Sequence, residues 1–193
     1  MMIDRLAESL NSDFAGGIVS REVSFGDLTL IVKPDYLVDI ARDLRDNPDL
    51  RFDLLLDIAA VDNMKRWPEG VDDDEYDEDA RFEVVYIFNS TAHNHRIRLK
   101  VQLPEDDPVL PTLTGIYGSA DWGEREAFDM MGIRFTGHSN LKRILTHYKF
   151  KGYALRKDYP VDKEQWLDEP EPLVDEILAR LDARGIEVRF EEL

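Results

Sequence analysis

The sequence has 193 residues, of which 43% are hydrophobic, so it fits a single domain that can bury a core without disulfides or metals. It contains no cysteine, which excludes thiolate nucleophiles, disulfide frameworks and cysteine-bound zinc or iron–sulfur clusters on this chain. Its 24 Lys and Arg residues against 41 Asp and Glu residues give a net charge of −17, which disfavours binding to nucleic acid or to anionic lipid.

The first residues, MMIDRLAESL, do not have the composition of a targeting segment. Acidic residues lie where a signal peptide needs a basic start, and the Arg-rich, acid-poor character of a transit peptide is missing. The most apolar stretch, residues 54–61, is interrupted by Asp57 and is far shorter than the roughly 20 residues that span a bilayer. We therefore expect membrane association only through partners.

The first third of the chain alternates between helical and strand periodicity. A helix is expected over 3–10, and strands over 19–25 and 28–32 are joined by Gly26 and Asp27. A helical stripe over 37–44 ends before Asn47-Pro48. The dense apolar run that follows, 52–61, is typical of a central strand.

Two further strands are expected over 82–88 and 95–103. In the second, Arg96, Arg98 and Lys100 alternate with apolar residues, so one face is basic and the other faces the core. The sum is an α+β fold: a mixed or antiparallel sheet with helices packed on one face.

Beyond residue 103 the pattern changes. A short helix is expected over 110–117 and a stronger one over 122–131, closed by Gly132. Residues 1–132 would form the core domain and residues 133–170 an extended basic docking arm with little periodicity. Residues 171–193 would form a terminal helix, starting near Pro172, and a short strand over 186–190.

Two groups of residues could in principle bind a metal. The acidic run 71–79 has seven carboxylates in nine residues, but an EF-hand loop starting at Asp72 needs glycine where the chain has Asp77. His93 and His95 would project from one face of a strand, yet no third ligand is evident nearby. We assign no metal site, and interpret the acidic run as a solvated loop.

The helix over 122–131 carries four charged residues whose spacing limits their chemistry. Glu124 and Glu126 lie about 200° apart around the helix axis, so they do not form a catalytic carboxylate pair. Arg125 and Asp129 are spaced for an ion pair on the helix surface. Alternatively, Glu124 and Glu126 each bind a separate basic partner, in the same subunit or in another, and so hold the following loop in place.

The segment 142–157 contains six basic residues and no acidic ones, together with Tyr148, Phe150 and Tyr153. Such a bias is usually an exposed face, but the aromatic residues make it resemble an interface for an acidic protein partner. The chain has no Gly-rich phosphate loop, no nucleophile elbow and no strong Ser-His-Asp arrangement, so no catalytic or cofactor-binding residue is assigned.

Residues 121–160 closely resemble the signature of the 30 kDa subunit, or C-subunit, of proton-pumping NADH:quinone oxidoreductase (respiratory complex I). The resemblance rests on Glu124-Arg125-Glu126, Asp129, Gly132, Gly137-His138, Arg143-Ile144-Leu145, Gly152 and Leu155-Arg156-Lys157-Asp158-Tyr159-Pro160. Segments 52–62, 81–88 and 93–108 are also similar, so it covers most of residues 30–165. The chain departs from the family at Ser139, where a proline is frequent, and at Tyr153-Ala154, where His-Pro is frequent.

The resemblance implies a subunit without cofactors of its own, since iron–sulfur clusters, FMN, NADH and quinone belong to partner subunits. It implies packing against the D-subunit in the peripheral arm of complex I. The missing transit peptide and the modest length favour a bacterium, in which this subunit would lie on the cytoplasmic face of the inner membrane. The resemblance also implies support for electron transfer from NADH to quinone coupled to proton translocation. The residues expected to fix the docking arm are Glu124, Arg125, Glu126, Asp129, His138, Arg143, Arg156, Lys157 and Asp158.

Two alternatives stay open. One is a homologous subunit of a membrane-bound energy-converting hydrogenase or of another quinone-reducing dehydrogenase. The other is a stand-alone acidic adaptor or calcium-binding module that uses the run 71–79.

Overall fold

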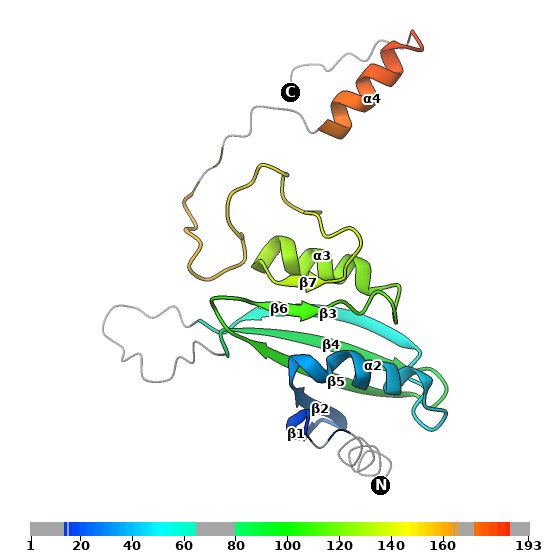
Figure 1. Cartoon of the computed structure of the whole chain (residues 1–193). Coiled ribbons are helices and arrows are strands. Elements are labelled where there is room, and N and C mark those ends of the chain that lie inside the picture. Colours follow the sequence, from blue (N-terminus) through cyan, green and yellow to red (C-terminus); the bar gives the residue numbers. More distant parts are fainter. Residues whose placement is uncertain (1–13, 15, 65–79, 164, 166–171, 186–193) are drawn as a thin grey trace, which may run out of the picture.

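A computed structural model describes residues 14, 16–64, 80–163, 165 and 172–185. Five strands form one sheet in the order β1-β2-β5-β4-β3, and two short strands form a second. Figure 1 shows α2 and α3 beside the larger sheet, with the chain after α3 looping around that helix. The strands are β1 (Ile18–Ser24), β2 (Asp27–Val32), β3 (Leu54–Asp62), β4 (Phe82–Ser90), β5 (His95–Leu103), β6 (Val109–Pro111) and β7 (Arg134–Thr136). The helices are η1 (Pro34–Tyr36), α2 (Leu37–Asp46), α3 (Ala120–Met131) and α4 (Pro172–Asp182).

The larger sheet is mixed. β2 pairs in parallel with β5, whereas β1–β2, β3–β4 and β4–β5 are antiparallel. The β1–β2 turn contains Phe25 and Gly26, both with positive φ, a conformation that suits a tight hairpin. The expected α+β fold with a mixed sheet is confirmed.

The core lies on one face of this sheet. Alternate residues of the central strands, such as Leu99 and Tyr86, are fully buried there. α2 contributes Leu37, Ile40, Ala41 and Leu44 to the same core. The opposite face of β5 carries Arg96, Arg98 and Lys100, which confirms the predicted division of that strand.

α3 covers the core beside β3 because it can approach that strand closely. A Cβ atom at Gly123 would lie 2.9 Å from Cβ of Ile58, so only glycine fits this contact. The helix ends at Gly132, whose φ of 77° provides the left-handed cap that the sequence predicts.

Two expectations about the elements are wrong. Residues 52–61 do not supply a central strand, since β3 is the last strand of its sheet. Part of this strand is apolar because α3 packs against it. Two further apolar residues, Leu54 and Leu56, are exposed. Residues 110–117 are not a helix, because Leu110 pairs with Phe135 in the parallel β6–β7 sheet and turns follow. The expected helix 3–10, the acidic run 71–79 and the strand 186–190 lie outside the described residues.

Candidate partner-docking site

Nine residues were predicted to fix the docking arm, and they lie on two segments. Four of them, Glu124, Arg125, Glu126 and Asp129, belong to α3. The other five, His138, Arg143, Arg156, Lys157 and Asp158, belong to the chain after β7, which we call the arm (residues 137–163). Seven of the nine, all except Glu124 and Glu126, make hydrogen bonds or ion pairs that join the arm to the core domain.

Asp129 is the first anchor of the arm. Its Oδ2 accepts the backbone N–H groups of Ile144, Leu145 and Thr146 at 2.9, 2.8 and 2.9 Å. Its Oδ1 accepts Nη1 of Arg143 at 2.7 Å and the hydroxyl of Thr146. The carboxylate, which is fully buried, therefore organises a whole turn of the arm.

The electrostatics of this anchor follow from its donors. Burial alone would raise the pKa of Asp129, but the hydrogen bonds from Thr146, Leu145 and Arg143 outweigh it and lower the pKa to about 2. The carboxylate is thus charged at neutral pH and fully paired. The predicted surface ion pair between Arg125 and Asp129 is wrong, because Asp129 points into the protein and binds Arg143.

Arg156 is the second anchor. Its guanidinium lies 4.8 Å from the ring centroid of Phe82 and 4.5 Å from that of Tyr153, and its Nε donates to the carbonyl of Met131 at 2.7 Å. Burial lowers its pKa, with a contribution from nearby Arg81. Tyr153 also packs on the end of α3, where a Cβ at Gly132 would lie 2.5 Å from its ring.

Arg81 is the third anchor, and no motif in the sequence reveals it. Its side chain is only 1% exposed and donates to Asp62, Glu105 and Asp158 at 3.2, 2.5 and 3.0 Å. Oδ2 of Asp62 also accepts the backbone N–H of Lys157 at 2.9 Å. Two signals were available: Arg81 begins the family-like segment 81–88, and it directly precedes a core-facing strand residue, where a buried charge needs paired carboxylates.

Glu124 has a structural role within the core. It is fully buried, and its carboxylate accepts the hydroxyl of Thr112 at 2.5 Å and the backbone N–H of Leu113 at 2.7 Å. Burial raises its pKa, and the two hydrogen bonds oppose that rise. The expectation of a basic partner is wrong for Glu124, whose hydrogen-bonding partners are neutral groups that fix the turn after β6.

Arg125 and His138 tie α3 and the arm together at a further point. Arg125 stacks 5.2 Å from the Trp122 ring and donates to the carbonyl of Lys142 at 3.1 Å. The buried ring of His138 lies 3.2 Å from the carboxylate of Asp121. Glu126, by contrast, is exposed and has no hydrogen bond or ion pair with any residue that the structure describes.

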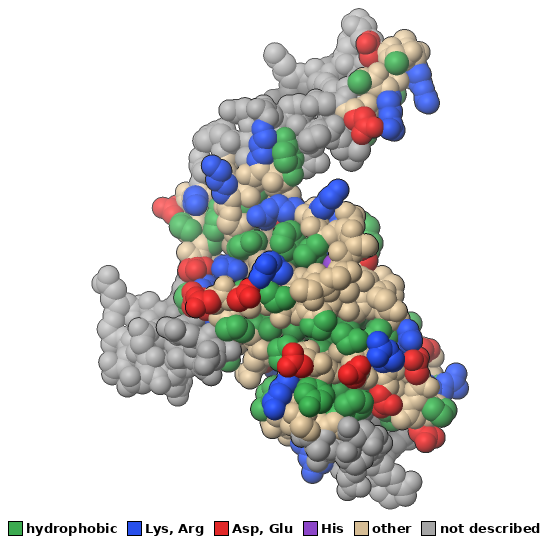
Figure 2. Space-filling model, viewed as in Figure 1, with side chains coloured by type: hydrophobic (Ala, Val, Ile, Leu, Met, Phe, Trp, Pro, Cys, Tyr) green, Lys and Arg blue, Asp and Glu red, His purple; other side chains and the backbone are tan. Residues whose placement is uncertain are grey.

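The outer surface of the arm is basic and partly apolar. Lys142, Lys149, Lys151, Lys157 and Lys163 are all exposed, and Figure 2 shows Lys and Arg side chains gathering over this part of the molecule. Tyr148, Leu155 and Val161 are 45%, 57% and 87% exposed beside them. Basic and apolar side chains on a segment held by these contacts suit the binding of an acidic protein surface.

Of the two groups that could in principle bind a metal, the acidic run 71–79 lies outside the described residues, and only His93 and His95 can be placed. His93 and His95 stack with ring centroids 5.5 Å apart, and no group of three potential ligands occurs among the described residues. Burial lowers the pKa of His95, whose ring also packs against Phe52 at 4.9 Å. In the structure the two rings pack on each other at the β4–β5 hairpin.

Comparison with known proteins gives a consistent result. The family model described as the respiratory-chain NADH dehydrogenase 30 kDa subunit matches residues 30–165. The NADH-quinone oxidoreductase C-subunit of Ruegeria pomeroyi is 50% identical over 143 residues, which cover 74% of this chain and 65% of the relative. Its namesake in Burkholderia multivorans is 44% identical over 160 residues, which cover 82% of this chain and 77% of the relative. The chain thus aligns with slightly less than two thirds of the Ruegeria protein.

Two solved structures share the fold. A trypsin-resistant fragment of Nqo5 (residues 1–134) superposes with a TM-score of 0.57 at 28% identity and covers 73% of this chain and all of its own. A chain of the membrane-bound sulfane sulfur reductase, an archaeal respiratory membrane complex, superposes with a TM-score of 0.65. The latter covers all of this chain and 97% of its own, and at 21% identity it shows the fold alone.

Proposed function

The chain belongs to the respiratory-chain NADH dehydrogenase 30 kDa subunit family, and we propose that it is a cofactor-free structural subunit of the peripheral arm of an NADH:quinone oxidoreductase. Its task is to present a rigid docking surface to neighbouring subunits. The complex transfers electrons from NADH to quinone and couples this to proton translocation, while this chain fixes geometry.

The observation that carries the proposal is the way the arm is held. An irregular segment of this length is ordered only if its polar groups find partners, and here buried Asp129 and Arg81 and the partly buried Arg156 supply them. Because these three residues face inward, the exposed lysines and apolar residues of the arm remain on its outer surface, where a partner can reach them. We infer that the anchoring serves this surface.

We propose that the partner of the arm is the D-subunit, the neighbour that the family resemblance implies. Electron transfer and conformational coupling in other subunits depend on fixed distances, so a displaced scaffold would lower turnover even though no reacting group is lost. Docking through preformed basic and aromatic side chains keeps the ordering cost at binding low. The iron–sulfur clusters, FMN and quinone then lie on other subunits.

We also propose that the chain lies peripherally, on the cytoplasmic face of a bacterial inner membrane. Among the described residues, no helix is both long and apolar enough to cross a membrane. Attachment through neighbouring subunits is the arrangement that we propose.

The proposal is tested by tagging this chain in its native host and solubilising the membranes in mild detergent. We expect the D-subunit and cluster-bearing subunits to co-purify, together with NADH oxidation that is sensitive to quinone-site inhibitors. Recovery of hydrogenase subunits would replace the proposal with the hydrogenase alternative, and recovery of a lone monomer would refute both.

A further inference from the structure

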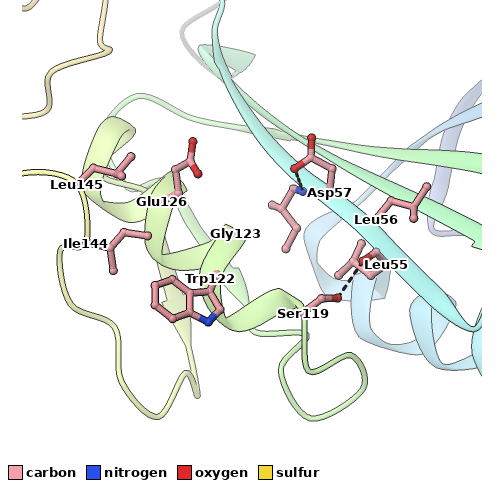
Figure 3. Close-up of a pocket in the computed structure, with 10 residues that line it drawn as sticks. Leu55, Leu56, Asp57, Ser119, Trp122, Gly123, Glu126, Ile144 and Leu145 are labelled. Carbon is pink, nitrogen blue, oxygen red and sulfur yellow. Dashed lines mark hydrogen bonds between the residues drawn. The ribbon is translucent and has the colours of Figure 1, made fainter.

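A second surface lies between α3 and β3, next to the turn of the arm that Asp129 binds. It is a groove with a cavity volume of about 400 Å³. Figure 3 shows residues from β3, from α3 and from the arm around it. The residues that matter for its chemistry are Leu56, Asp57, Trp122, Glu126 and Leu145.

The groove is lined by large apolar side chains that stay exposed. Leu56, Trp122 and Leu145 are 51%, 65% and 62% accessible to solvent. Exposed tryptophan and leucine grouped at one place mark interaction sites more than scattered apolar residues do. A small ligand would not be enclosed by side chains this exposed, whereas a protein segment laid across them would bury all three.

The local structure builds this surface. The β3–β4 register shifts between Leu55 and Asp57, so Leu56 is a bulged residue on an edge strand, and a bulge re-aims a side chain. Trp122 and Glu126 lie four residues apart on one face of α3, and Gly123 lets that face approach β3. Arg125 stacks on the indole and holds it in place.

Two carboxylates lie at the rim of the groove. Within the described part of the chain, Asp57 accepts only the adjacent N–H of Ile58 at 2.9 Å, and Glu126 has no hydrogen bond or ion pair. In Figure 3 both carboxylates point to the same side of the groove, away from Trp122 and Ser119. A cation held there would meet two negative charges beside an apolar floor.

We propose that this groove binds a segment of a partner subunit that carries a large apolar side chain and, beside it, a Lys or Arg that pairs with Glu126. The positive charge of this segment complements the acidic rim of the groove. The surface expected to bind the arm is instead acidic. The chain thus contacts its neighbours with two surfaces of opposite charge, the basic outer surface of the arm and the acidic rim of this groove. This inference rests on the proposed function, since it names a second contact within the same assembly.

The groove is tested by site-specific photo-crosslinking in the native complex. A photoreactive amino acid at Leu56 is compared with the same residue at Val23, which is 55% exposed on β1, the opposite edge strand. We expect Leu56 to cross-link to one segment of another subunit with Lys or Arg within a few residues, and Val23 not to reach that segment. Cross-linking only to a second copy of this chain, or no cross-link beyond the Val23 background, would overturn the inference.

Charge reversal provides the second measurement. Glu126→Lys should reduce the amount of the cross-linked partner recovered with the tagged chain about fivefold. Glu22→Lys, at an exposed glutamate on β1, should leave recovery unchanged. Exchanging the identified partner cation for glutamate should restore recovery in Glu126→Lys. Equal recovery with both single variants would contradict the pairing.

The two proposals fail separately. If the wild-type chain does not co-purify with respiratory subunits, the proposed function falls, and the groove with it. If the wild-type complex assembles but Leu56 finds no other subunit, only the groove proposal is overturned.

Discussion

Arg143 and Asp129 form an ion pair in which Nη1 of the arginine donates to the buried carboxylate at 2.7 Å. The pair connects the last part of α3 to the beginning of the arm. The same arginine donates to the carbonyl of Gly152 at 3.0 Å, so one side chain links three parts of the chain. Order in the arm therefore depends on a charge located in the core domain.

Replacing Asp129 with Asn should release the first turn of the arm. The amide would present an N–H₂ group to donors that need an acceptor, and we expect a loss of about 2–4 kcal/mol of unfolding free energy. Hydrogen exchange should show faster exchange at the amides of Ile144, Leu145 and Thr146. Asp39→Asn, at an exposed carboxylate that pairs only with Arg42 among the described residues, is the control and should change neither quantity. Unchanged exchange in Asp129→Asn would contradict the anchor.

The pH dependence of stability should report the same carboxylate. Its folded pKa of about 2 lies below the ordinary value of 3.8, so its contribution is present above pH 3.8 and is lost as the pH falls toward 2. The shift corresponds to roughly 2 kcal/mol. Urea unfolding of the wild type and of Asp129→Asn should give curves that converge as the pH falls below 4, whereas a constant gap down to pH 2 would contradict this.

The contribution of Glu124 to stability should change with pH in the opposite direction. Its folded pKa is raised above the ordinary value of 4.5, so any stability it contributes is present below pH 4.5 and is lost as the pH rises through the folded pKa. Gln resembles the protonated form and keeps an acceptor for the N–H of Leu113. The unfolding free energy of Glu124→Gln minus that of the wild type, measured by urea unfolding, should therefore be greater at pH 7 than at pH 4. If this difference is instead greater at pH 4, the charged carboxylate stabilises the folded state and the prediction is wrong.

Gly123→Ala tests the close approach of α3 to β3. Its Cβ would lie 2.9 Å from Cβ of Ile58, and we expect a loss of about 1–3 kcal/mol because neither backbone can move freely. Gly118→Ala is the matched control, since a Cβ there meets no atom within 4 Å. Equal thermal stabilities of the two variants would show that the packing of α3 on β3 is looser than described.

Much of the fold could be predicted from local sequence, and the reasons are visible in particular elements. The alternation in 95–103 and the Gly132 cap are local signals, and both match the structure. The edge position of β3 could not be predicted, because its apolar residues reflect the packing of α3 and an exposed groove that only the tertiary structure creates. Strand pairing between residues 109–111 and 134–136 is likewise a long-range event.

The candidate site was predicted only in part. The spacing of Arg125 and Asp129 suggested a surface pair, but the arm captures Asp129 through contacts 14 to 17 residues away. Arg81 had no motif, since its role depends on Asp62, Glu105 and Asp158, which are distant in sequence. Helical spacing finds neighbours on one helix and cannot find partners from an irregular segment.

The most direct test of the account is the effect of Arg156→Glu on assembly. The reversed charge cannot stack between Phe82 and Tyr153 or donate to Met131, so the arm should lose its second anchor. We expect native gels of solubilised membranes to show the intact complex depleted about tenfold or more, with the KM for NADH unchanged in what remains. Arg42→Glu, at an exposed arginine on α2, should assemble normally. Normal assembly of Arg156→Glu with an altered response to NADH would contradict the central claim that this chain acts by holding a docking surface in place.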